Sequence, residues 1–274
     1  MSSAWRWLDD ARRVADQPRD PAREPLLPSA GDEAIGSVEP VLARKLVAAG
    51  LPLRRSTRGW RVDPPLDRSL ATIARWLDAH GLAAPWRDEL LVVTTSAGEP
   101  IGVVERAVVR VLGIATFAVH LVGVSADGRY WVQQRSFAKA TDPGRWDTMM
   151  GGQVAAGERV EATLERETME EAGLAVADLI DLQRCDDVVV RRPIAEGDIY
   201  ERIAVYRARV PDALAPVNRD GEVERFESPD RRALVERLAA GAFTLEATLI
   251  LGAELRGGDA SDCPQHRPRH LPVG

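Results

Sequence analysis

The sequence predicts an α/β protein in which a larger domain, over residues 111–256, is preceded by a small α+β domain, over residues 33–110. Two observations predict this organisation. The second half of the chain passes from a β-hairpin through a Gly-rich loop into an acidic helix, and the first half alternates short helical and β-like segments. A chain of 274 residues is long for one domain and sufficient for two.

Composition and charge narrow the classes of partner. Hydrophobic residues make up 45% of the chain, charged residues 28%, and the formal net charge is −6. Because binding to nucleic acid requires a basic surface, we expect no nucleic-acid partner, and any phosphate recognition must be local. The amino terminus lacks the apolar core of a signal peptide, and no apolar run approaches the ~18 to 20 residues that span a bilayer. We therefore expect a cytoplasmic protein, a monomer or homodimer, with no membrane partner.

The first half of the chain gives a sequence of short elements. Residues 1–32 combine the pattern of a short amphipathic helix (Trp5, Leu8, Val14) with the Pro- and charge-rich run DQPRDPAREPLLP. Because the spacing of its prolines disfavours regular structure, we expect a flexible lead-in. Amphipathic periodicity predicts helices over residues 38–49 and 66–80, each followed by Gly. Alternation predicts a hairpin over residues 53–62 and two strands over residues 89–96 and 99–107. The tryptophans of this unit are expected to pack in its core: Trp60, Trp76 and Trp86.

The second half begins with a predicted hairpin, FAVHLVGV and RYWVQQRS, around the turn Asp127-Gly128. Further strands are expected over residues 186–191 and 200–210, followed by the stretch DGEVERF, and helices over 233–240 and 243–255. Residues 257–274 have the composition of a disordered tail. The spacing of Cys263, His266 and His270 in that tail fits no zinc site, and two cysteines are too few for a disulfide framework.

The candidate metal-binding and catalytic residues lie between the hairpin and the later strands, in the stretch GGQVAAGERVEATLERETMEEAGL. Helical geometry over residues 160–172 places Glu167, Glu170 and Glu171 within roughly 100° of arc. Like charges at this spacing repel, so the cluster indicates a compensating partner, and a hard divalent cation is the natural one. The alternative is a solvated Glu-rich helix. Gly173 has the place of a left-handed C-terminal cap. A neighbouring face could pack on a sheet through Val160, Leu164, Thr168 and Ala172.

The full spacing of this stretch resembles the Nudix box, with one departure at Thr168, where that family usually has an aliphatic residue. The pattern comprises Gly152, Glu158, Arg166-Glu167, Glu170-Glu171 and Gly173-Leu174. The segments HLVGVS, WVQQRSFAKATDPGRWDTMMGGQVAAGE, VYRARVPDALAPVNRDGEVERF and FTLEATLIL resemble the thiamine-pyrophosphokinase-related subfamily of Nudix hydrolases, whose members carry a preceding domain of unknown function. The resemblance implies a Nudix α/β/α sandwich with a mixed sheet, and a metal-dependent diphosphatase that converts X–P–P to X–P plus phosphate.

The resemblance also implies a metal site. Mg²⁺, with Mn²⁺ as an alternative, would be bound by Glu167, Glu170, Glu171 and the Gly151 carbonyl. Arg166 would orient Glu167 through a bidentate contact, which a planar guanidinium makes well.

The general base is left open between two regions. Glu167 is the first choice, and Glu222 or Glu224 of the later stretch is the second. Binding to a metal lowers the pKa of a carboxylate, which favours a base outside the metal's own ligands.

For the substrate, the resemblance implies thiamine diphosphate or its damaged oxo and oxy analogues. Arg135 and Lys139 are candidates to bind its terminal phosphate, and Trp146 is a candidate to stack on its ring, with core packing as the alternative. His120 is expected to be structural, and Cys185 a small buried hydrophobic residue.

Three other functions compete. A nucleotide or dinucleotide diphosphohydrolase is the first, because Nudix specificity resides in loops and accessory domains. An isopentenyl-diphosphate-type isomerase is less favoured, since the loop WDTMMGGQ lacks the catalytic Cys of such enzymes. A non-catalytic Nudix-fold binding module is also less favoured, because every glutamate of the box is present.

Overall fold

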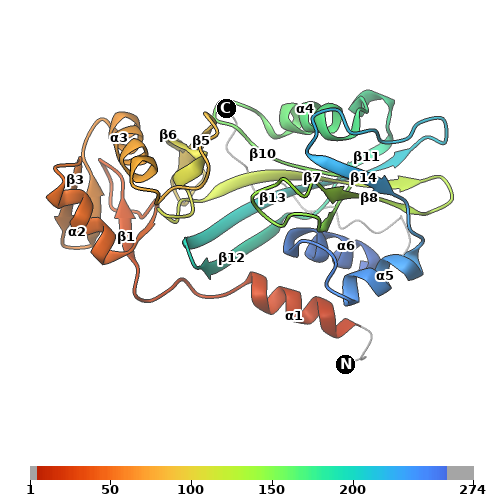
Figure 1. Cartoon of the computed structure of the whole chain (residues 1–274), viewed down its shortest axis with the longest axis horizontal. Helices are drawn as coiled ribbons and strands as arrows, with labels where there is room; N and C mark the ends of the chain where they lie inside the picture. The colour runs from red at the N-terminus through yellow and green to blue at the C-terminus, as the bar shows by residue number, and fades with distance from the viewer. Residues whose placement is uncertain (1–4, 258–274) are drawn as a thin grey trace.

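The larger domain is built on an eight-stranded mixed sheet in the computed structural model, which describes residues 5–257 (Figure 1). Its main path runs β11-β13-β7-β8-β14, with β10 paired to β7, β12 to β13 and β9 to β8. β13 is parallel to β7 over ten residue pairs, from 201↔116 to 210↔125, and the other pairings are antiparallel. The strands are β7 Thr116–Ser125, β8 Tyr130–Arg135, β9 Trp146–Asp147, β10 Met150–Gln153, β11 Ile180–Arg184, β12 Val188–Ile194, β13 Gly197–Val210 and β14 Val223–Glu227.

Helices cover both faces of this sheet because its central strand alternates between two apolar cores. In β7, Phe117 and Val119 pack in the core beneath α4, which spans Val160–Ala172. Ala118 and Val122 point the opposite way, into the core beneath α6. This second layer comprises α5 Arg231–Ala239 and α6 Leu245–Gly257, with α1 Arg6–Ala15 against them. The predicted α/β/α sandwich with a mixed sheet is therefore confirmed.

The acidic helix α4 has the bounds that the periodicity predicts. Gly173 ends it in a left-handed conformation with φ 64°, and its N–H donates to the carbonyls of Met169 and Thr168. Val160 and Leu164 pack on the sheet, and Thr168 is fully buried among them. The hydroxyl of Thr168 has no hydrogen-bond partner among residues 5–257, so this position carries a buried polar group where an aliphatic residue would fit.

The small domain has its own core between a four-stranded sheet and two helices. The sheet has the order β2-β1-β4-β3, and a separate ribbon pairs β5 with β6. The predicted tryptophan packing is confirmed for Trp60, which is 5% exposed, while Trp76 and Trp86 pack partly buried against the same core. The elements are β1 Glu24–Leu27, β2 Gly36–Val38, α2 Pro40–Ala48, β3 Leu53–Ser56, β4 Gly59–Val62, α3 Leu66–Ala79, β5 Leu90–Thr94 and β6 Pro100–Glu105.

The expected flexible lead-in is instead ordered from residue 5 onward. α1 packs on the larger domain, where Leu8 is fully buried against Gly252 of α6. β1 then joins the small domain, antiparallel to β2 and parallel to β4. The Pro-rich run does disfavour local structure, but buried Leu26 and Leu27 supply tertiary contacts that override this preference. The chain thus starts on the larger domain, builds the small one, and returns.

The two domains are joined by backbone pairing and by a buried polar network. The N–H of Ala156 donates to the carbonyl of Leu90 at 2.8 Å. Asp198, at the start of β13, accepts from the Ser37 hydroxyl at 2.5 Å and pairs with the Arg23 guanidinium at 3.1 Å. These contacts hold β5, β2 and the segment before β1 against the larger domain.

Two sequence expectations about the ends and the membrane can be placed here. No helix within residues 5–257 is long and apolar enough to cross a membrane. The predicted disordered tail lies outside the described residues, apart from Gly257, the last residue of α6.

Candidate functional site

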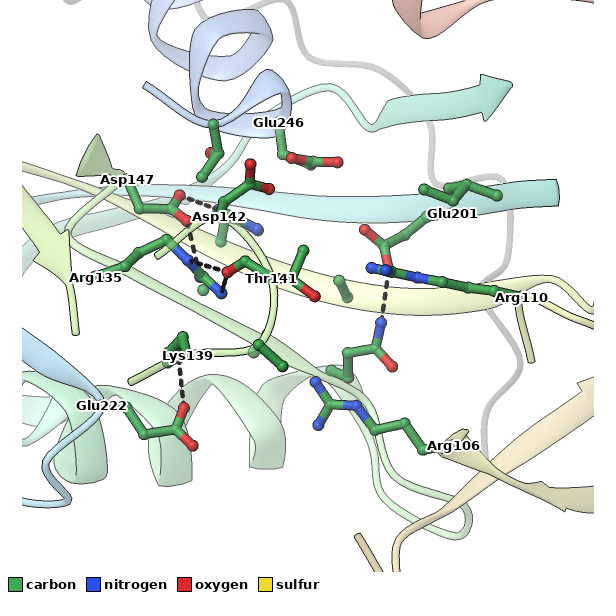
Figure 2. Close-up of a pocket in the computed structure, with 18 of the residues that line it drawn as sticks. Arg106, Arg110, Arg135, Lys139, Thr141, Asp142, Asp147, Glu201, Glu222 and Glu246 are labelled. Carbon is green, nitrogen blue, oxygen red and sulfur yellow. Dashed lines mark hydrogen bonds and ion pairs between the residues drawn. The ribbon is translucent and has the colours of Figure 1, made fainter. Parts of the chain in front are cut away.

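A polar pocket of about 360 Å³ lies where the small domain meets the sheet and the start of α6 (Figure 2). Both domains contribute to its lining, which is dominated by charge. Its cations are Arg87, Arg106, Arg110, Arg135, Lys139 and Arg192. Its carboxylates are Asp142, Asp147, Glu167, Glu196, Glu201, Glu222 and Glu246. Figure 2 shows Lys139 and Glu222 on one side, Glu246 and Asp142 on another, and Arg106 and Arg110 entering from the small domain.

Glu171 lies under the pocket, where α4 meets β8 and β10. It is 1% exposed, and its carboxylate accepts from the Gly151 N–H at 3.0 Å and from Gln133 Nε2 at 2.9 Å. The Lys139 ammonium is 3.4 Å away. Burial raises the pKa of Glu171, and Lys139 and the two hydrogen bonds oppose that rise.

Glu167 lies one helical turn earlier and lines the pocket itself. Its carboxyl packs directly on Gly152, where an added Cβ would lie 2.2 Å from Glu167 Cδ. Burial, and then the charge of Glu171, raise its pKa to about 7. Two carboxylates therefore converge beside the Gly151-Gly152 backbone, as the spacing of α4 predicts.

Arg166 holds this pair in place, but through a different contact from the one expected. Its bidentate partner is Glu158, with Nε and Nη2 each 2.9 Å from a carboxylate oxygen. Glu167 receives one hydrogen bond, from Nη1 at 2.8 Å, and Glu170 shares the same nitrogen at 3.0 Å. The prediction of a bidentate contact to Glu167 is wrong, because Glu158, in the turn before the helix, occupies the planar fork.

Glu170 lies apart from the other two glutamates. Its side chain is 48% exposed, it contacts Arg166, and it is not part of the pocket lining. Among residues 5–257, no group of three or more His, Cys, Asp or Glu side chains is placed to hold a metal ion. The remaining pair, Glu167 and Glu171, still fits Mg²⁺, which proteins often bind through one or two carboxylates plus substrate phosphates. A cation there would relieve the charge repulsion that raises the pKa of Glu167.

Of the two alternative candidates for the general base, Glu222 and Glu224, only Glu222 lines the pocket. Glu222 lines the pocket and pairs with the Lys139 ammonium at 2.5 Å. Burial raises its pKa, but Lys139, with Arg87 and Arg106, outweighs burial and lowers the value overall. Glu224 is exposed and is not part of the pocket lining. The structure does not support Glu224 as a base.

The predicted substrate contacts are brought together in part. Arg135 and Lys139 both line the pocket. Trp146 does not: it is 8% exposed and packs with Phe243 in the core beneath α6, at a ring-centroid distance of 6.5 Å. The prediction that Trp146 stacks on substrate is wrong for this structure, because its position in β9 turns the indole to the core while the next residue, Asp147, lines the pocket.

The spacing of residues along the chain did not identify three other residues of the pocket lining, His120, Glu201 and Glu246, as part of the site. His120 of β7 is buried and structural, as expected, with Nδ1 2.8 Å from the Thr148 hydroxyl, yet its ring also packs on Gly151 and lines the pocket. Burial lowers its pKa. Glu201 accepts from Gln153 Nε2 at 2.7 Å. For Glu246 one signal existed, a single glutamate in the otherwise apolar segment FTLEATLIL.

Comparison with known proteins finds similarity to the NUDIX domain family and to Nudix hydrolases. Residues 115–246 match the NUDIX domain family. The chain is similar to Nudix hydrolase 24, chloroplastic, of Arabidopsis thaliana, with 30% identity over 187 residues, 62% of this chain and 48% of that protein. It is also similar to an isopentenyl-diphosphate Delta-isomerase of Corynebacterium glutamicum, with 29% identity over 167 residues, 59% of this chain and 87% of that protein. The chain spans about half the length of the Arabidopsis relatives, 48% of Nudix hydrolase 24 and 44% of Nudix hydrolase 20, chloroplastic.

Among solved structures, DR0079 from Deinococcus radiodurans has the same fold. It superposes with a TM-score of 0.51 at 20% identity, covering 61% of this chain and 99% of that one.

Proposed function

We propose that this protein is a metal-dependent hydrolase of diphosphate linkages, converting X–P–P to X–P plus phosphate, and the match of residues 115–246 to the NUDIX domain family supports this proposal. One observation carries the proposal. Glu167 and Glu171 converge beside the Gly151-Gly152 backbone, next to a pocket lined by cations that suit phosphate oxygens. A charged pocket of this kind suits a small polyanion and not an extended polymer.

A divalent ion, Mg²⁺ or Mn²⁺, would be held by Glu167 and Glu171 with the Gly151 carbonyl. When bound, it would neutralise charge on the phosphate oxygens. Glu158 and Arg166 keep Glu167 in position, and Gln133 and the Gly151 N–H keep Glu171 in position.

Hydrolysis requires a water and an acceptor for its proton. The water oxygen forms a bond to phosphorus, the bond from phosphorus to the bridging oxygen breaks, and a water proton passes to a carboxylate. Glu167 is our first choice for that carboxylate because it lines the pocket beside Glu171. Glu222 is the second, since it lines the pocket and its ion pair with Lys139, which also contacts Glu171, keeps it ionised.

For the substrate we propose thiamine diphosphate or its oxo and oxy analogues. The support is the resemblance of the flanking segments, together with a pocket that has two kinds of charge. Arginines and Lys139 suit the diphosphate, and Glu201 and Glu246 suit a cationic or hydrogen-donating ring. No Phe, Tyr or Trp within residues 5–257 lines the pocket, so recognition of the ring would depend on charge and hydrogen bonds.

The isomerase alternative has less support. The similarity to isopentenyl-diphosphate Delta-isomerase extends over 59% of the chain, but an isoprenoid tail gains binding energy from apolar surface. This pocket is lined mainly by charged side chains, and within residues 5–257 no cysteine lines it.

A hydrolysis screen tests the proposal. The purified chain would be incubated with Mg²⁺ and thiamine diphosphates, nucleoside triphosphates, ADP-ribose, dinucleotides and isopentenyl diphosphate, and phosphate release measured as kcat/KM. We expect the thiamine compounds to lead. If nucleotides lead by a wide margin, the substrate proposal fails, and if nothing releases phosphate, the hydrolase proposal fails.

Glu171→Gln tests whether the proposed site is responsible for hydrolysis. This change keeps side-chain size but removes a carboxylate, so we expect turnover to fall by orders of magnitude with the melting temperature largely retained. Undiminished kcat in this variant would refute the assignment of Glu171.

A further inference from the structure

Three arginines of the small domain line the pocket, although none of the carboxylates proposed for catalysis lies in that domain. They are Arg87, in the segment before β5, Arg106, in the short 3-10 helix Arg106–Val108, and Arg110, just after it. Arg106 is held by Glu89, which accepts its side chain at 2.6 Å and its backbone N–H at 2.9 Å. The small domain therefore presents cations at a defined place in the site.

The position of Arg110 is set by the larger domain. Its carbonyl accepts the Asp198 N–H at 3.0 Å, and Gly197 packs so closely that an added Cβ would lie 2.0 Å from that oxygen. The first two residues of β13 thus hold the Arg110 backbone in place. Figure 2 shows the Arg110 side chain extending into the pocket.

The cations that line the pocket differ in how far nearby carboxylates already neutralise them. Lys139 pairs with Glu171 and Glu222, and Arg135 pairs with Asp147 at 3.3 Å. Arg106 pairs with Glu89 at 2.6 Å. By contrast, no hydrogen bond or ion pair within residues 5–257 engages the guanidinium groups of Arg87, Arg110 and, in the larger domain, Arg192.

Since carboxylates and cations are both abundant in the pocket lining, attraction of an anion must be local, at guanidinium groups that no carboxylate already pairs with. The planar guanidinium donates two parallel hydrogen bonds to a phosphate, which makes arginine the side chain best suited to hold one. Because backbone pairing between Leu90 and Ala156 and the ion pair of Arg23 with Asp198 fix the two domains together, these arginines keep a constant place relative to Glu167.

We propose that the small domain is part of the substrate site and that Arg87, Arg106 and Arg110 bind the phosphate groups of the substrate. The identity of the anion as a diphosphate rests on the proposed function, whereas the binding of phosphate by these side chains does not. Because the arginines reach the pocket from a domain that carries none of the carboxylates proposed for catalysis, we expect them to contribute to binding in the ground state and the transition state alike. Their loss raises KM more than it lowers kcat.

The experiment uses full-length Arg87→Ala and Arg110→Ala, with Arg44→Ala as the matched control, an exposed arginine on α2 of the same domain. Calorimetry measures the binding of inorganic pyrophosphate, with and without Mg²⁺, and steady-state kinetics measure turnover of thiamine diphosphate. Each pocket variant is expected to weaken pyrophosphate binding about 10- to 100-fold, with a similar rise in KM and kcat within about threefold. The control is expected to match the wild type.

The outcomes separate this inference from the proposed function. Pocket variants that bind pyrophosphate as the control does would overturn the inference, whatever the enzyme hydrolyses. If the wild type binds pyrophosphate and the variants lose it, but no diphosphate is cleaved, the inference stands and the hydrolase proposal fails. Arg110→Lys covers the case in which the alanine variant fails to fold: it keeps the charge without the planar fork, so its affinity should lie below wild type, and wild-type affinity would count against the inference.

Discussion

Replacing Glu246 by Gln is expected to stabilise the protein in neutral and alkaline solution. Glu246 is the second residue of α6, and its carboxyl lines the pocket without a cationic partner among residues 5–257. Burial, followed by the charges of Glu201, Asp147 and Asp142, raises its pKa to about 7. The folded state therefore resists ionisation of this group.

The size of the effect follows from the difference between two pKa values. The carboxyl has an ordinary pKa of 4.5 and a folded-state pKa of about 7. The difference corresponds to about 3 kcal/mol, since one pKa unit is worth about 1.4 kcal/mol. Between these values the folded state binds more protons than the unfolded state, so the free energy of unfolding falls as pH rises. Below pH 4.5 the carboxyl is neutral in both states and the penalty vanishes.

Gln cannot ionise, so the variant lacks this penalty. It also loses the attraction of a first-turn carboxylate to the helix dipole, worth about 0.3 to 1 kcal/mol. We therefore expect Glu246→Gln to be more stable than wild type by about 2 to 3 kcal/mol at pH 8, with the gain shrinking to near zero at pH 4.

Urea denaturation between pH 4 and 8, without metal or substrate, measures this difference. The exposed Glu99→Gln serves as the control and should show no such pH-dependent gain. A Glu246→Gln variant no more stable than wild type at pH 8 would refute the reasoning.

Two further changes test the packing of the acidic helix. Thr168→Val replaces a buried, unpartnered hydroxyl with a methyl group of similar shape, so the free energy of unfolding should rise by about 1 to 2 kcal/mol in urea titrations; a decrease would show that the hydroxyl is satisfied. Gly152→Ala places a Cβ 2.2 Å from Glu167 Cδ, so the carboxyl must move: kcat should fall at least about tenfold while the melting temperature changes little, and wild-type kcat would contradict the proposed role of Glu167.

Local pattern was sufficient for the elements whose signal lies within a few residues. The helix over Val160–Ala172 and its cap at Gly173 match the prediction because helical periodicity and a left-handed glycine are properties of the local backbone. The hairpins around Asp127-Gly128 and residues 57–58 match for the same reason. The convergence of Glu167 and Glu171 follows from their i,i+4 spacing.

The errors arise where tertiary contacts compete with local preference. Arg166 had two carboxylates within reach along the helix, and the turn that carries Glu158 decided which one fills its bidentate fork. The sequence pattern allows the Trp146 side chain to face either side of its strand. In the structure its indole packs in the apolar core that contains Phe243. The Pro-rich part of the lead-in has no local preference for regular structure, but buried Leu26 and Leu27 hold it in place as β1. Leu8, packed on Gly252, holds α1 against the larger domain.

By itself the sequence determined the extent of the acidic helix and the convergence of two of its carboxylates, since Glu167 and Glu171 lie one helical turn apart. Only the tertiary structure decided which distant side chains share the pocket with them. The pairing of β13 with β7 brings Glu201 there, and the hydrogen bond from the Asp198 N–H to the Arg110 carbonyl brings Arg110 there. The packing of α6 on the sheet brings Glu246. These are non-local contacts, which depend on the burial of whole faces and leave no fixed spacing in the chain.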